Sequence, residues 1–102
     1  MTDKLTPPES LNESTSLIWV YQTTKDNDIA TVLIQKYEPM VKMAAGKIAR
    51  NRPDLYEDLY QVGQMALIRL LQQYDIEMGI PFEPYAMKSM IGHMKNFLRD
   101  KS

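Results

Sequence analysis

The sequence predicts an all-α protein, a compact bundle of about five helices. Apolar residues recur at helical spacing in several segments, and the 102 residues include eight Met but only four Gly, a composition that favours helices over sheet. A chain of this length is expected to form a single core. We therefore expect a flexible lead-in over residues 1–10, which contain two prolines, and one helical domain over residues 11–102.

The first half of the chain carries signals for three helices. One is expected at Asn12–Thr23, with Trp19 lying off its apolar face. Asp26 is a suitable N-cap for a second helix. Pro39 is expected to start a third helix that ends near Arg50, because proline suits the first position of a helix.

The longest predicted helix is Asp54–Tyr74, and it has two continuous faces. Asp54 is expected to cap it, with Glu57 three residues later. Its inward face is apolar, and its opposite face carries Asp58, Gln61, Met65, Ile68 and Gln72. Periodicity leaves two alternatives open for Met65 and Ile68, which are an interface with a partner or cover by another segment of the same chain.

A loop of about ten residues, Asp75–Pro84, is expected to lead into the last helix, with Pro84 at the first helical position. The apolar face of that helix predicts packing against the core. Its other face is basic and aromatic, with Tyr85, Lys88, Gly92, Lys95 and Arg99. Gly92 fits either close approach of a DNA backbone or partner, or tight packing between helices.

Charge is segregated along the chain, although the net charge is only -1. Residues 41–53 and 84–101 each carry four basic residues against at most one acidic residue, whereas the rest of the chain is acidic. Two basic patches on an acidic body are expected when one part of a surface meets DNA and another meets protein. Two solvated basic faces are the plainer alternative.

No enzyme signature is present in the sequence. It has one His, no Cys, no glycine-rich phosphate loop and no metal-ligand pair, so neither a metal nor a cofactor is expected, and His93 is interpreted as structural. The absence of Cys fits a reducing cytoplasm. No stretch approaches the roughly 20 apolar residues of a membrane span. A cytoplasmic location without a membrane partner is therefore predicted.

Asp58–Leu67 reads D-L-Y-Q-V-G-Q-M-A-L, which resembles the D-L-x-Q-x-G-x-x-x-L signature of bacterial sigma-70 family transcription initiation factors. Tyr37–Val41 upstream and Tyr74–Ala86 downstream resemble other segments of the same family's region 2, in the same order. Ile91–Lys101 is most similar to the general-stress and sporulation sigma factors of Gram-positive bacteria. The resemblance covers residues 28–101 and implies a sigma region 2 fold.

The resemblance implies two binding surfaces. In this family the helix that corresponds to Asp54–Tyr74 docks on the coiled-coil clamp helices of the largest subunit of core RNA polymerase. Together with the outer face, this gives a predicted polymerase-binding set of Asp58, Gln61, Val62, Gln64, Met65 and Ile68. The following loop and helix hold the melted minus-ten promoter element through aromatic rings and cations. The predicted DNA-binding set is Phe82, Tyr85, Lys88, Gly92, Lys95, Asn96 and Arg99, although Phe82 also suits a core position.

The predicted function is therefore that of a transcription initiation factor domain, with an anti-sigma factor as a further expected partner. Lys88-Ser89 stand where housekeeping members have a tryptophan pair, so strand separation is expected to be less autonomous. The chain is expected to stop before the later sigma domains. The alternative function is a helical protein-interaction module that binds polymerase or an anti-sigma factor without binding DNA independently.

Overall fold

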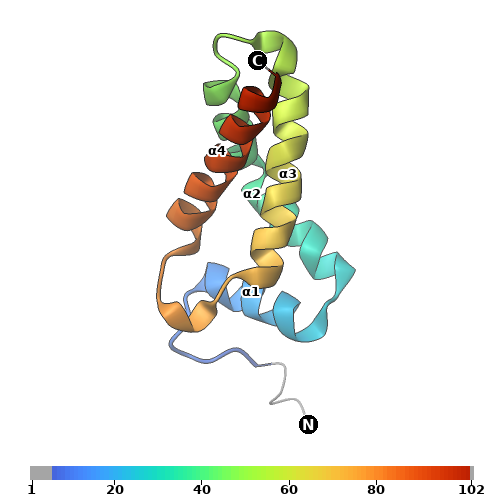
Figure 1. The fold of residues 1–102 in the computed structure, drawn as a ribbon. Helices are drawn as coiled ribbons and strands as arrows, with labels where there is room; N and C mark the ends of the chain where they lie inside the picture. The colour runs from blue at the N-terminus through green and yellow to red at the C-terminus, as the bar shows by residue number, and fades with distance from the viewer. Residues whose placement is uncertain (1–5, 102) are drawn as a thin grey trace.

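A computed structural model describes residues 6–101, and its described part is built from four α-helices (Figure 1). They are α1 (Glu13–Thr24), α2 (Asn27–Ile48), α3 (Tyr56–Gln73) and α4 (Phe82–Lys101), with short 3₁₀ helices η2 (Pro53–Leu55) and η3 (Ile76–Met78). No strand occurs within residues 6–101. The all-α prediction is confirmed, whereas the expected count of about five helices is slightly too high.

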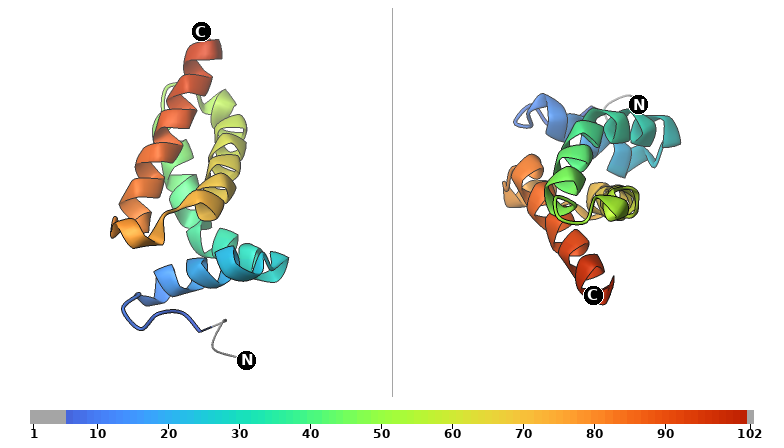
Figure 2. Two further views of the ribbon diagram at one scale, coloured as in Figure 1. Left: turned by 60° about the horizontal axis from the view of Figure 1, so that its bottom comes forward. Right: turned by 90° about the horizontal axis from the view of Figure 1, so that it is seen from above.

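The molecule is elongated, with extents of 53 × 25 × 19 Å. The three longer helices run along its length, and α1 lies across one end (Figures 1 and 2). The segment between α3 and α4 returns to the same end as α1, while the α2–α3 connection lies with the C-terminal end of α4 at the other end (Figure 1). The two ends of the bundle are therefore built from different parts of the sequence.

The expectation of a helix start at Pro39 is wrong, because this residue lies inside the continuous helix α2. An interior proline removes one helical hydrogen bond and crowds the preceding turn, which costs about 3 kcal/mol or more. Tyr37 and Val41 on either side of it are 4% and 0% exposed. Packing of these side chains against α3 and α4 offsets the cost and keeps α2 in one piece.

Two of the predicted helix starts are also corrected. Asp26 caps α2 as predicted, since its side chain accepts a backbone N–H bond of 2.8 Å from the first turn. At α3, however, η2 precedes the helix without a side-chain cap, and Asp54 instead pairs with Arg52 at 3.0 Å. At α4 the helix begins at Phe82, so Pro84 is its third residue, where the missing N–H still removes no helical bond.

Part of the expected lead-in, residues 1–5, lies outside the described residues. From Thr6 to Ser10 the chain forms no helix, and the N–H of Leu11 donates to the carbonyl of Pro8 at 3.2 Å. The side chain of Asn12 then accepts from a backbone N–H of α1 at 2.8 Å and fixes the start of that helix. The N-terminal segment is thereby brought against the end of the bundle that holds α1.

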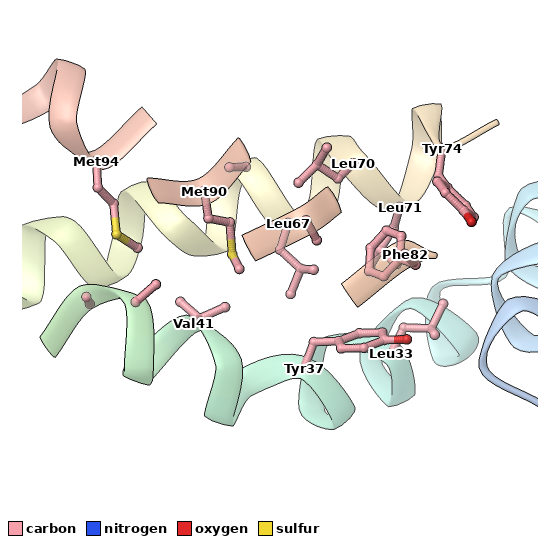
Figure 3. Packing of buried hydrophobic residues seen from close by; sticks show 14 of the residues in the cluster. Leu33, Tyr37, Val41, Leu67, Leu70, Leu71, Tyr74, Phe82, Met90 and Met94 are labelled. Atoms are coloured by element: carbon pink, nitrogen blue, oxygen red, sulfur yellow. The ribbon is translucent and has the colours of Figure 1, made fainter. Parts of the chain in front are cut away.

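One apolar core runs between α2, α3 and α4 (Figure 3). Its largest fully buried side chains come from all four helices and include Ile18, Leu33, Val41, Leu59, Leu67, Leu71, Phe82, Met90 and Met94. Gly63 marks the closest approach, because a Cβ atom there would lie 2.6 Å from Met94 Cε and 2.9 Å from Val41 Cγ1. The predicted inward faces of α3 and α4 are therefore confirmed, and their opposite faces are left for solvent or partners.

Candidate functional site

The α3 outer face consists of Asp58, Gln61, Met65, Ile68 and Gln72, and all five residues are exposed. Met65 is 65% exposed and Ile68 is 40% exposed. No described segment of the chain covers them, so the alternative that another part of the chain buries these side chains is wrong for residues 6–101. Exposed apolar side chains among amides and one carboxylate are typical of a binding surface.

Two further residues of the predicted polymerase-binding set, Val62 and Gln64, are only half-buried and flank the α3 outer face. The Nε2 of Gln64 donates to the Tyr60 hydroxyl at 2.7 Å, and this hydroxyl donates to Glu38 Oε2 at 2.6 Å. The bond to Glu38 raises the pKa of Tyr60. Gln64 is therefore engaged in a link between α3 and α2, and its amide nitrogen is already used within the domain.

The α4 outer face consists of Tyr85, Lys88, Gly92, Lys95 and Arg99, and all five residues are exposed. Tyr85 is 40% exposed, and Arg99 Nη2 donates to the side-chain oxygen of Asn96 at 2.9 Å. A Cβ atom on Gly92 would meet nothing within 4 Å. Tight packing between helices therefore does not explain Gly92, and the alternative of close approach by a partner remains.

A hollow of about 170 Å³ lies between α3 and α4, at the edge of the α3 outer face. Val62, Met65, Ala66 and Arg69 of α3 line it together with His93 of α4. His93 is exposed at this point, so its imidazole is part of the surface between the two faces rather than part of the core. A partner that covers Met65 on the α3 outer face would therefore also lie close to His93 of α4.

Phe82 belongs to the core and not to the DNA-binding surface that the sequence suggested. Its side chain is 1% exposed, and its ring lies 5.1 Å from the ring of Tyr37 and 5.1 Å from the ring of Tyr74, measured between centroids (Figure 3). A ring enclosed in this way offers no free surface for stacking. The expectation of a base-stacking platform at Phe82 is therefore corrected, because α4 starts at this residue and turns its ring inward.

Tyr74 connects the core to the exposed ring of Tyr85, a role that the sequence did not reveal. The centroids of these two rings are 6.0 Å apart, and the Tyr74 hydroxyl donates to the carbonyl of Ile80. A hollow of about 340 Å³ beside them is also lined by Gln73, Asp75, Met78 and Ile80. Met78 is 64% exposed and Ile80 is 40% exposed. The two apolar residues on either side of Gly79 were the only sign of this hollow in the sequence.

A half-buried hydrogen bond joins the first turn of α4 to α2. The Tyr37 hydroxyl donates to Glu83 Oε2 at 3.1 Å. Burial, together with the nearby carboxylate of Glu83, raises the pKa of Tyr37 to about 12. Burial and the charges of Glu83 and Asp75 also raise the pKa of Tyr74. Both hydroxyls are therefore neutral at ordinary pH and act as hydrogen-bond donors.

Among residues 6–101 there is no group of three or more His, Cys, Asp or Glu that could hold a metal ion. None of the described helices combines the length and the apolar character needed to cross a membrane. What the described surface offers is an amide and apolar face on α3 and a cationic and aromatic face on α4. This combination is typical of surfaces that bind other macromolecules.

Residues 33–102 match the family described as Sigma-70 region 2. The chain therefore belongs to the sigma-70 family of transcription initiation factors, which are not enzymes. It is similar to the RNA polymerase sigma-B factor of Bacillus subtilis, with 38% identity over 101 residues that make up 99% of this chain and 37% of that protein. The relationship predicted from the signature in α3 is confirmed.

Two other relatives agree with this assignment. The RNA polymerase sigma-B factor of Bacillus anthracis is 31% identical over 86 residues, which are 84% of this chain and 33% of that protein. The RNA polymerase sigma-F factor of Kitasatospora aureofaciens is 33% identical over 78 residues, which are 76% of this chain and 26% of that protein. The chain thus spans about a third of the length of these relatives, or somewhat less.

Proposed function

We propose that this chain is the part of a sigma factor that docks on core RNA polymerase and holds the melted minus-ten promoter element. The single observation that carries the docking proposal is the exposure of Met65 and Ile68 on the α3 outer face, 65% and 40%. A helix that served only the core would carry charged residues there. The partner surface proposed for this face is the pair of clamp helices of the largest polymerase subunit.

The DNA-binding part of the proposal rests on the α4 outer face. Tyr85 offers an exposed ring for stacking, and Lys88, Lys95 and Arg99 place cations on one side of the helix for phosphate contacts. Gly92 lies between these cations with open space above it, which permits a DNA backbone to come close. The side-chain oxygen of Asn96 accepts a hydrogen bond from Arg99. Phe82 is excluded from the proposed DNA-binding surface because its ring is buried.

Polymerase docking is tested by capture of bacterial core RNA polymerase on immobilised protein. We expect Gln61→Ala and Ile68→Glu to weaken capture while helical content stays unchanged. Val32→Glu is the matched control, because Val32 is 48% exposed on α2, away from the α3 outer face. Normal capture by a folded Ile68→Glu variant would show that the α3 outer face is not the docking surface.

DNA binding is tested by measuring the affinity for a single-stranded minus-ten oligonucleotide over a range of salt concentrations. Stacking contributes roughly 1–3 kcal/mol per base, so Tyr85→Ala should weaken binding with little change in the salt dependence. Lys95→Ala should instead flatten the salt dependence, because it removes a phosphate contact. Lys36→Ala on α2 is the matched control for the loss of one positive charge.

The same measurements decide between the two functions. If both α4 variants bind the oligonucleotide as the unmodified chain does, while the α3 variants lose polymerase, the domain is a protein-interaction module without independent DNA binding. The anti-sigma factor expected from the resemblance and the cytoplasmic location expected from the composition stay predictions. Competition between such a factor and core polymerase tests the first, and simultaneous binding of both would exclude direct occlusion of the α3 outer face.

A further inference from the structure

Gln22 of α1 reaches across to the C-terminal end of α3. Its Nε2 atom donates to the carbonyl of Leu71 at 2.9 Å and to the carbonyl of Tyr74 at 2.8 Å. The last four carbonyl groups of a helix receive no hydrogen bond from within the helix, so they need donors from elsewhere. A side chain distant in sequence therefore satisfies two carbonyls at the point where the chain leaves α3.

Gln22 holds Tyr74 in place, and the ring of Tyr74 lies against the exposed ring of Tyr85 on the α4 outer face. The backbone of Tyr74 is fixed by Gln22, its hydroxyl donates to the carbonyl of Ile80, and its ring lies against the rings of Phe82 and Tyr85. The segment 75–81 is thus tied at its start through Gln22 and near its end through Ile80. A shift of Tyr74 moves both this segment and the exposed ring of Tyr85.

Trp19 lies on the same helix as Gln22, and its fluorescence can report on the contact between Gln22 and Tyr74. It is the one tryptophan of the chain, and with Gln22, Tyr74 and Ile76 it lines a hollow of about 700 Å³. A second bond, from Gln72 Nε2 to the Tyr21 hydroxyl at 3.3 Å, also joins α3 to α1. Helix α1 lies before residues 33–102, which are the part that matches Sigma-70 region 2.

We infer that Gln22 is a positioning residue through which α1 sets the orientation of segment 75–81 and of Tyr85. The effect on DNA binding rests on the proposed function of the α4 outer face, whereas the effect on the segment itself does not. Gln22 lies on α1, outside the α4 outer face, and acts through Tyr74. Its loss leaves two half-buried carbonyls without their donor and frees the start of the segment.

The experiment compares Gln22→Met, which keeps the length of the side chain but removes the donor, with Gln22→Lys, which keeps a donor near the end of α3. Hydrogen exchange in residues 75–81 should become faster by about tenfold in Gln22→Met, because two hydrogen bonds are lost. The fluorescence emission of Trp19 should also shift in Gln22→Met. Exchange in the core of α2 and α4 reports global unfolding separately, and Gln35→Met on the exposed side of α2 is the matched control.

Binding of the minus-ten oligonucleotide completes the test. If the orientation of Tyr85 matters, Gln22→Met should weaken the affinity by about threefold or more, since the competent orientation is then only partly populated. Gln22→Lys should restore both exchange protection and affinity, and capture of core polymerase should not change in either variant. These results together support the positioning role.

Two results overturn the inference, and a third overturns the proposed function alone. Unchanged exchange over residues 75–81 and unchanged Trp19 emission in Gln22→Met would show that Gln22 does not hold the segment. Faster exchange with normal oligonucleotide affinity, in a chain that Tyr85→Ala weakens, would leave Gln22 as a helix cap alone. Normal affinity in both Gln22→Met and Tyr85→Ala would instead show that the proposed DNA-binding surface is wrong, and hydrogen exchange and Trp19 emission would then decide by themselves whether Gln22 holds the segment.

Discussion

Leu67 and Ile68 are neighbours on α3, but their side chains point in directions about 100° apart around the helix. Leu67 is 0% exposed among the side chains of three helices, whereas Ile68 is 40% exposed on the α3 outer face. The same contrast recurs on α4, where Met90 and Met94 are buried and Lys95 is exposed. Stability therefore rests on the inward faces of these two helices and the proposed binding on their outer faces, so substitutions should separate the two.

The largest expected effect comes from truncating the inward member of this pair. Leu67→Ala should lower the free energy of unfolding by about 2–5 kcal/mol, because it removes a fully buried side chain and leaves a cavity. Ile68→Ala should change it by no more than about 0.5 kcal/mol, since surface substitutions of this kind have small effects. Urea unfolding of both variants measures the difference, and a similar loss in both would contradict the assignment of the two faces.

The inward-facing Tyr37 should make the stability of the fold sensitive to alkaline pH. The folded-state pKa of Tyr37 is about 12, above its unfolded value of about 10, so its neutral form stabilises the fold. This stabilisation is complete below pH 10 and is lost as pH rises through 12, an effect of about 2–3 kcal/mol at most. The loss of stability between pH 8 and high pH, measured by unfolding, should be smaller in Tyr37→Phe than in the unmodified chain.

The third prediction concerns Gly63, on the inward face of α3. A methyl group there would overlap Met94 Cε and Val41 Cγ1, and Val41 is a stiff, fully buried side chain that cannot easily move. Overpacking costs about 1–3 kcal/mol, and alanine regains about 1 kcal/mol of helix propensity relative to glycine. Gly63→Ala should therefore lower stability by up to about 2 kcal/mol in thermal or urea unfolding. A rise in stability would show that the contact with α2 and α4 is looser than the structure indicates.

The inward and outward faces were predictable from the sequence because they depend only on helical periodicity. Leu59, Leu67 and Met94 are buried, and Met65 is exposed, as the spacing requires. The family was also predictable, since the signature in Asp58–Leu67 is a local pattern. Both kinds of information are contained in short stretches of chain.

The features that sequence reasoning missed or left open depend on contacts between distant segments. Pro39 continues a helix because residues on both sides of it are buried against α3 and α4. Phe82 turns inward because Tyr37 and Tyr74 provide a place for its ring. Gln22 caps α3 from 49 and 52 residues away. None of these partners is adjacent in the sequence, so propensity and spacing carry no sign of them.

The smallest expected effect is at Gly92, the outward counterpart of Gly63. A Cβ atom there would meet nothing within 4 Å, so Gly92→Ala should raise stability by about 0.5–1 kcal/mol through helix propensity alone. In a domain of this size that gain should raise the melting temperature by several degrees. If a DNA backbone approaches the α4 outer face closely at Gly92, the added methyl group should nevertheless weaken binding of the minus-ten oligonucleotide. A more stable variant that binds the oligonucleotide as tightly as before would remove Gly92 from the DNA-binding set and leave Tyr85 and the cations as its members.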